Sequence, residues 1–420
     1  MVMSGTAIAQ AMGFALMPLI SRLYTPDDFG VFGTFNSVAG VLCVGATLQY
    51  SQALMLPKRH GQSASLLWAA CFSVLSVSML CLVAVAAFPV AVVGLLKAQH
   101  AGYLLWLLPL AVLVSGSNQC LQAWFVRRKA FGVTATAQVT RTLVASGAQV
   151  ATGICRDGTG LIYGAIAGDA ASSIGMLRLA VTRDRKLLLG ALTWKRIWGA
   201  AREYSDFPLF SMPQNVLNSA SQGLPVILLT HYYGITTAGY YAFGIRILQA
   251  PMNLILNALR QVLFQRISEV HNRDGRVHGL FVRSTIGLSL VALLPTLAVM
   301  LWGPELFSRV FGSNWLLAGQ YARWLLLWSA VGFCNVPSVL LARVLRQQRY
   351  LLILDVIVLL VRIGVLVYGG NCLPALRTVQ LFSVAGAALN GALIVWVWCL
   401  SAAVDRKLLR SGVLADAVGR

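Results

Sequence analysis

The sequence predicts an all-α polytopic membrane protein with about twelve transmembrane helices in two six-helix pseudo-repeated lobes. Hydrophobic residues make up 58% of the 420 residues and charged residues 11%. The apolar residues gather in twelve runs of about 17–25 residues, the length that crosses a hydrocarbon core of roughly 30 Å as a helix. Backbone groups in lipid must be satisfied within the segment, so such runs form helices. They begin near Met3, Val31, Leu66, Tyr103, Val133, Leu161, Phe207, Tyr240, Thr285, Tyr321, Leu351 and Thr378.

Basic residues alternate between the gaps that separate these runs. Of the 33 Lys and Arg, 24 fall in the even-numbered gaps and the C-terminal tail, and six fall in the odd-numbered gaps. The positive-inside rule then places both termini in the cytoplasm. The net charge of +20 is therefore mainly a topology signal, with some attraction to anionic headgroups, and we expect no nucleic-acid partner. The first run lacks a basic n-region and a cleavage site, so it is interpreted as a helix and not a signal peptide.

A weak internal repeat relates the two halves of the chain. The stretch SRLYTPDDFGVF (residues 21–32) aligns with THYYGITTAGYY (residues 230–241) at an offset of about 209. Six helices per half is an even number, so the two copies are parallel repeats, an arrangement typical of transporters with a cavity between the halves. The first copy also carries a helix start, with Thr25 as N-cap, Pro26 at N1 and Asp28 at N3. The predicted domains are an N-terminal lobe (1–180), a cytoplasmic linker (181–203), a C-terminal lobe (204–403) and a cytoplasmic tail (404–420).

Motifs for energy conversion, metal binding and hydrolysis are absent from the sequence. There is no GxxxxGK[ST] for ATP, no HExxH and no GxSxG elbow. The five His are dispersed, the eight Cys form no CxxC pair, and the gaps predicted to face outward are short. The sequence therefore predicts no catalytic residue, no metal and no cofactor, and it disfavours an enzyme.

Amide side chains recur at three- and four-residue steps within two predicted spans, so each set shares one helix face. Further amides and hydroxyls lie in other spans, among them Gln49 and Gln119. Polar faces on several helices indicate a wet cavity suited to a sugar; the alternative is hydrogen bonding between helices. The candidate substrate-binding amides are Gln214, Asn218 and Gln222 in one span, and Gln249, Asn253 and Asn257 in the other.

Ionisable residues within the spans are a second set of candidates, because a charge in lipid normally faces a cavity or a partner. Arg141, Arg246 and Arg362 are candidates for binding a phosphate through bidentate hydrogen bonds. For Arg141, snorkelling toward the cytoplasmic surface is the alternative. Asp169 either pairs structurally with Arg141 or titrates in proton or sodium coupling. Asp355 lies two turns before Arg362 and either balances it or has a coupling role.

Several stretches together resemble one family, and their order spans nearly the whole chain. The chain resembles polysaccharide-export flippases, the O-antigen and exopolysaccharide branch of the multidrug/oligosaccharidyl-lipid/polysaccharide superfamily. The matching stretches are SGTAIAQ (residues 4–10), SRLYTPDDFGVFG (21–33), WFVRRKAFG (124–132), YSDFPLFSMPQNVLNSASQGLPVILL (204–229) and GPELFSRVFGSNWLLAGQYAR (303–323).

The resemblance implies a protein that moves an undecaprenyl-diphosphate-linked oligosaccharide across the bacterial inner membrane. It implies a cationic cavity for the diphosphate and sugars, while the lipid tail stays among the membrane lipids. It also suggests a polysaccharide polymerase and assembly proteins as partners. The motif positions carried over as candidates are Arg22 and Arg141; Asp169 stands where the family pattern has an uncharged residue.

The sequence therefore favours a lipid-linked oligosaccharide flippase that works by alternating access. Three alternatives remain open. A cation-coupled drug or metabolite antiporter of the same superfamily would carry acidic residues in its cavity, whereas these spans hold more Arg than Asp or Glu. A membrane glycan polymerase or ligase would need catalytic residues on the outer face. A scaffold of a glycan assembly complex would not depend on the cavity arginines.

Overall fold

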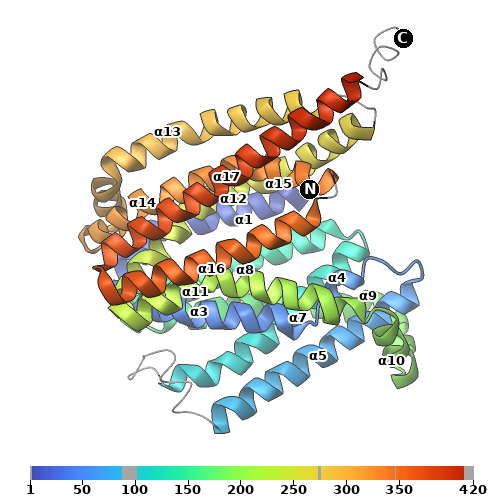
Figure 1. The fold of residues 1–420 in the computed structure, drawn as a ribbon. Helices are drawn as coiled ribbons and strands as arrows, with labels where there is room; N and C mark the ends of the chain where they lie inside the picture. Colours follow the sequence, from blue (N-terminus) through green and yellow to red (C-terminus); the bar gives the residue numbers. More distant parts are fainter. Residues whose placement is uncertain (1, 88–101, 273–275, 346, 411–420) are drawn as a thin grey trace. The chain divides into compact units, whose positions relative to one another are not determined.

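The computed structural model describes residues 2–87, 102–272, 276–345 and 347–410, and the described chain is helical throughout with short connections (Figure 1). Helices of the first part are α1 (Val2–Ala15), α2 (Met17–Leu23), α3 (Pro26–Ala46), α4 (Tyr50–Ala53), α5 (His60–Ala87), η1 (Gly102–Trp106), α7 (Leu107–Arg127), α8 (Phe131–Ile154), α9 (Gly160–Ala191), α10 (Trp194–Glu203), η2 (Phe207–Ser211) and α11 (Met212–Tyr233). The remainder are α12 (Ile235–Asn272), α13 (Val277–Phe311), η3 (Ser313–Trp315), α14 (Leu316–Cys334), α15 (Val336–Val344), α16 (Gln348–Cys372) and α17 (Ala375–Arg410).

The twelve predicted spans are each matched by a long helical segment of the described chain. Nine of these segments are long and apolar enough to cross a membrane. The other three are α8, α11 and α12, with 24, 22 and 38 residues, and α11 and α12 contain the two predicted polar stripes. The all-α polytopic fold predicted from the sequence is confirmed.

Contacts divide the chain into two compact units, residues 1–242 and 243–420. In the first unit, α8 packs on α9, α11 packs on α3, and α5 packs on α7. In the second unit, α13 packs on α14, and both contact α17. An aromatic cluster anchors the start of this unit, where the rings of Phe243 and Trp315 stack with centroids 3.9 Å apart. The lobe and linker boundaries drawn from the sequence remain a prediction.

The TPDD stretch starts α3 as the sequence predicts. Thr25 Oγ1 accepts a hydrogen bond from the backbone N–H of Asp28 at 3.3 Å, and the Asp28 carboxylate accepts from the Thr25 N–H at 2.8 Å. The preceding Tyr24 donates its hydroxyl hydrogen to the carbonyl oxygen of Gln149 at 2.7 Å. This part of the motif therefore joins the α2–α3 turn to α8, which is a structural role.

The two copies of the internal repeat contact each other reciprocally. A Cβ atom on Gly30 would collide with the carbonyl oxygen of Ile235, and a Cβ on Gly239 would collide with the carbonyl oxygen of Pro26. At an offset of 209, Pro26 corresponds to Ile235 and Gly30 to Gly239. Equivalent positions therefore exchange equivalent contacts, as expected for copies related by a two-fold axis. This geometry supports the repeat more strongly than its few identical residues do.

Gly30→Ala is expected to destabilise the protein, because the obstructing atom is a backbone oxygen that cannot rotate aside. Overpacking of this kind costs about 1–3 kcal/mol. The matched control is Gly147→Ala in α8, where an added Cβ meets no atom within 4 Å. That change should stabilise by about 0.5–1 kcal/mol, since alanine loses less backbone entropy in a helix. Thermal unfolding of the purified variants in detergent measures both; equal melting temperatures would contradict the close approach at Gly30.

Candidate functional site

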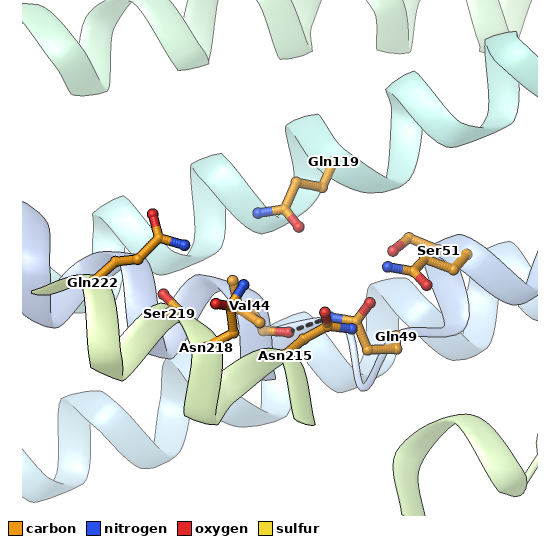
Figure 2. Close-up of a pocket in the computed structure, with 9 residues that line it drawn as sticks. Val44, Gln49, Ser51, Gln119, Asn215, Asn218, Ser219 and Gln222 are labelled. Carbon is orange, nitrogen blue, oxygen red and sulfur yellow. Dashed lines mark hydrogen bonds between the residues drawn. The ribbon is translucent and has the colours of Figure 1, made fainter. Parts of the chain in front are cut away.

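A polar cavity of about 340 Å³ lies within the first unit (Figure 2). Six of its nine lining side chains are amides and two are hydroxyls, and no charged residue is among them. They come from the end of α3, from α4 and the turn before it, from α7, and from the first half of α11. The lining residues are Val44, Gln49, Ser51, Gln52, Gln119, Asn215, Asn218, Ser219 and Gln222.

A break between α3 and α4 shapes one wall of the cavity. Leu48 and Gln49 adopt left-handed backbone conformations, with φ of 46° and 58°, which non-glycine residues rarely do. The Gln49 amide donates to the carbonyl oxygen of Val44 at 3.0 Å, so it satisfies a backbone group freed where α3 ends (Figure 2). Irregular backbone at membrane depth is tolerated where it lines a cavity. The strained turn therefore brings Gln49, Ser51 and Gln52 to one wall.

The α11 stripe forms the facing part of the lining. Asn218 and Gln222 line the cavity, and all three stripe residues are exposed, but Gln214 is not among the lining residues. Asn215 and Ser219 also line it, and the sequence analysis did not select them. They form a second row at a four-residue step beside the first, so the cavity follows the groove between two rows. That spacing was the signal that would have identified them.

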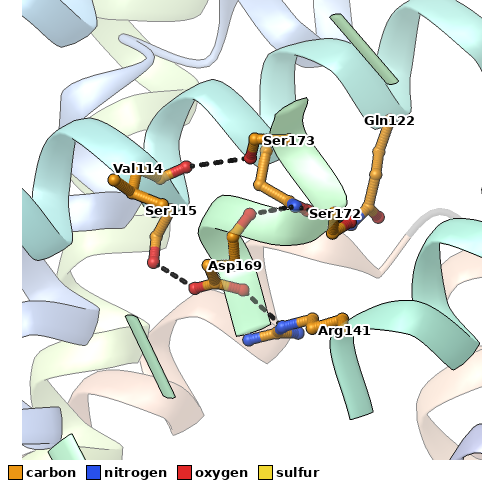
Figure 3. A network of polar contacts seen from close by, with 8 residues as sticks. Val114, Ser115, Gln122, Arg141, Asp169, Ser172 and Ser173 are labelled. Carbon is orange, nitrogen blue, oxygen red and sulfur yellow. Dashed lines mark hydrogen bonds and ion pairs between the residues drawn. The ribbon is translucent and has the colours of Figure 1, made fainter. Parts of the chain in front are cut away.

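Asp169 of α9 lies at the centre of a separate polar network in the first unit (Figure 3). Its carboxylate forms an ion pair with Arg141 of α8, and it accepts a hydrogen bond from the Ser115 hydroxyl at 2.5 Å. Asn118 donates to the backbone carbonyl oxygen of Asp169 at 3.3 Å and to the Ser172 hydroxyl at 2.9 Å. The Asp169 side chain is 9% exposed and that of Arg141 is 45% exposed. Of the two roles considered for Asp169, this geometry supports the structural pairing with Arg141. A role in ion coupling stays a prediction.

The four α12 candidates all belong to the second unit. Arg246 is partly buried, whereas Gln249 and Asn253 are exposed on the same helix. The side chain of Asn257 lies outside the described residues. Arg246, Gln249 and Asn253 therefore lie in the middle of α12, and their role in binding remains a prediction.

Arg362 of α16 lies against aromatic rings in the second unit. Its guanidinium carbon is 4.8 Å from the ring centroid of Trp328 and 5.8 Å from that of Phe382. A planar guanidinium stacked in this way is held in a fixed orientation, which a lysine would not reproduce. Asp355, two turns earlier, is exposed.

The other motif positions are associated with structural contacts. Arg22 is exposed in the last turn of α2 and is not among the cavity-lining residues. In the WFVRRKAFG stretch, Trp124 Nε1 donates to Asp184 at 3.0 Å and Arg128 pairs with the same carboxylate at 2.8 Å. Asp184 sits at a kink in α9, so these contacts stabilise the bend. Within the described ranges, no three His, Cys, Asp or Glu side chains are grouped to hold a metal ion.

The helical arrangement is similar to those of two solved transporter structures. A multidrug resistance MATE family transporter of the MOP superfamily, in an inward-facing conformation, matches with a TM-score of 0.77 at 13% identity over 95% of this chain and 99% of that one. The lipid II flippase MurJ, in an inward closed conformation, matches with a TM-score of 0.66 at 11% identity over 99% of both chains. At these identities the likeness establishes the fold alone.

The chain belongs to the polysaccharide biosynthesis protein family, whose model matches residues 19–319. The succinoglycan biosynthesis transport protein ExoT of Rhizobium meliloti (strain 1021) is 23% identical over 312 residues, which is 73% of this chain. The match spans 60% of the length of that relative. Family and fold together describe a multi-pass membrane protein of the polysaccharide biosynthesis family, as the sequence resemblance predicted.

Proposed function

We propose that this protein is a flippase that carries undecaprenyl-diphosphate-linked oligosaccharide repeat units across the bacterial inner membrane for polysaccharide assembly. The observation that carries the proposal is the uncharged, amide-lined cavity of the first unit. An amide group both donates and accepts hydrogen bonds, which matches the paired donor and acceptor character of sugar hydroxyls. A volume of about 340 Å³ is within the range of small-molecule sites.

The diphosphate requires cationic groups, and arginine suits it because the guanidinium binds phosphate oxygens in pairs. Arg141 already forms an ion pair with Asp169, so part of its charge is compensated. Arg141, Arg246 and Arg362 are the proposed headgroup residues. The apolar tail of the substrate remains in the bilayer, so only the polar part needs a protein site.

Transport follows by alternating access, without covalent chemistry by the protein. Proline residues inside α11 and α12, Pro225 and Pro251, interrupt the helix hydrogen bonds and give bending points for such a movement. Both termini lie in the cytoplasm in this proposal, on the strength of the basic residues of the even-numbered gaps. Reporter fusions at each terminus test that orientation.

A cation-coupled antiporter of the same superfamily is the second candidate. It is favoured by one observation, the carboxylate of Asp169 within a membrane helix next to Ser115 and Arg141. A drug-binding protein of this kind would depend on Asp169 and not on the amides of the cavity. Proton or sodium coupling of the flippase itself would use the same carboxylate.

The decisive experiment deletes the gene in its host and follows the radiolabelled pool of lipid-linked oligosaccharide in each membrane leaflet. Accumulation of complete repeat units on the cytoplasmic side is the expected result. Accumulation on the outer side would indicate a polymerase or ligase instead, and an unchanged pool would favour the antiporter.

A further inference from the structure

Helix α10 presents two tryptophans on its surface. Trp194 and Trp198 are 67% and 63% exposed, and their rings stack with centroids 6.5 Å apart. On a neighbouring face of this short helix, Ile197 and Ala200 are each 5% exposed and belong to the core of the first unit. A helix with one face packed on the protein and two exposed tryptophans beside it has an apolar surface that water does not favour.

Contacts along its length fix α10 to the first unit. Tyr50 donates its hydroxyl hydrogen to the carbonyl oxygen of Ala201 at 3.2 Å, and burial raises the pKa of this phenol, so it stays protonated. Gln62 donates to the Glu203 carboxylate at 2.6 Å. The helix is therefore a docked element, and its tryptophans are held in place.

The tryptophan pair lies against a helix that is long and apolar enough to cross the membrane. The ring of Trp194 packs edge-on against Phe72 of α5, with centroids 6.1 Å apart. Phe72 is twelve residues after the start of α5, which is about 18 Å along a helix at 1.5 Å per residue. Phe72 is itself exposed. Trp194 therefore rests on an exposed face of α5, a helix long and apolar enough to cross a membrane.

Basic residues flank the tryptophans on the side away from the core. At about 100° per residue, Arg202 and Lys195 follow Trp198 around the helix, and both are exposed. Two acidic groups near α10 are engaged, because Asp184 accepts from Trp124 and Arg128, and Glu203 accepts from Gln62. A third, Asp206 beyond the end of α10, is exposed. Further exposed basic side chains of this segment are Arg183, Arg185, Lys186 and Arg196.

We propose that α10 is an interfacial anchor that binds anionic phospholipid, with Trp194 and Trp198 at the acyl-chain boundary and Lys195 and Arg202 on the headgroup phosphates. Tryptophan rings favour the membrane interface, and basic side chains beside them attract anionic lipid. The leaflet is the one at the α9–α10 end of the first unit. This site is separate from the sugar cavity and does not depend on the transported substrate.

The test uses the purified full-length protein in liposomes of phosphatidylcholine and phosphatidylglycerol, with bromine on the acyl chains of one lipid at a time. Bromolipids quench nearby tryptophans, and the fluorescence lost in W194F/W198F isolates the pair from the other tryptophans. We expect brominated phosphatidylglycerol to quench this component about twofold more than brominated phosphatidylcholine. The matched control, W106F/W302F, removes two other exposed tryptophans and should leave the excess unchanged.

A second variant, K195Q/R202Q, keeps both tryptophans and removes the flanking charges. In this variant, the ratio of quenching by brominated phosphatidylglycerol to quenching by brominated phosphatidylcholine should fall toward one. The same ratio should fall toward one for the wild type at high salt. Equal quenching of the pair by both lipids in the wild type overturns anionic-lipid binding. Quenching by aqueous acrylamide with none from either bromolipid overturns the membrane position of the helix.

Discussion

Replacing Asn218 and Gln222 together by leucine is expected to lower glycan export by about 10- to 100-fold while the protein remains folded. Both side chains line the cavity, and both are exposed, so leucine at either site meets no packing obstacle. Each hydrogen bond lost to a sugar costs a net free energy of about 0.5–1.5 kcal/mol. Since 1.4 kcal/mol corresponds to about a factor of ten, two losses give the stated range. Export of radiolabelled glycan, normalised to the amount of inserted protein, measures the effect.

Gln214→Leu is the matched control for this prediction. Gln214 is also an exposed amide of α11, but it does not line the cavity. Its replacement should leave export near the wild-type rate. Equal loss from Q214L and from N218L/Q222L would mean that the whole helix face matters and that the cavity does not define the site. Normal export by N218L/Q222L would remove the cavity from the proposed function.

The helices could be predicted from the sequence because the bilayer imposes a length and a composition on each of them. The polar stripes also marked α11 and α12 before any coordinates were known, and neither is among the nine described segments that are long and apolar enough to cross a membrane. The capping box at Thr25 followed from local rules, since its three residues act within one turn. Local signals of this kind depend on a few neighbouring residues and need no tertiary information.

The cavity was only partly predictable, because its walls depend on contacts between distant segments. Gln49 was noted as a polar residue, but the left-handed turn that positions it is formed by Leu48 and Gln49 without a glycine, so the sequence does not predict the turn. Asn215 and Ser219 could be identified as lining residues only once the position of the groove between the two rows of α11 was known. For Asp169 the sequence left two roles open, pairing with Arg141 or ion coupling, and only the packing of α8 on α9 shows that this carboxylate and guanidinium meet.

Arg141→Gln is expected to destabilise the protein by about 2–4 kcal/mol, and more than Asp169→Asn does. Removing the arginine leaves a carboxylate that is 9% exposed with Ser115 as its remaining side-chain donor. Removing the carboxylate leaves an arginine that is 45% exposed and can turn toward the headgroups. The double variant R141Q/D169N leaves two neutral groups that can hydrogen-bond, so it should recover most of the loss. Thermal unfolding of the four proteins in one detergent gives the double-mutant cycle, and additive losses would contradict the pairing.

The same variants separate the structural role of Asp169 from ion coupling. If the carboxylate only pairs with Arg141, R141Q/D169N in liposomes should transport substrate with the same dependence on an imposed proton or sodium gradient as the wild type. If Asp169 carries the coupling ion, the double variant should stay folded and lose that dependence, because an amide does not titrate. Stability and gradient dependence are measured independently, so a protein that is stable but uncoupled would assign the carboxylate to coupling despite its ion pair.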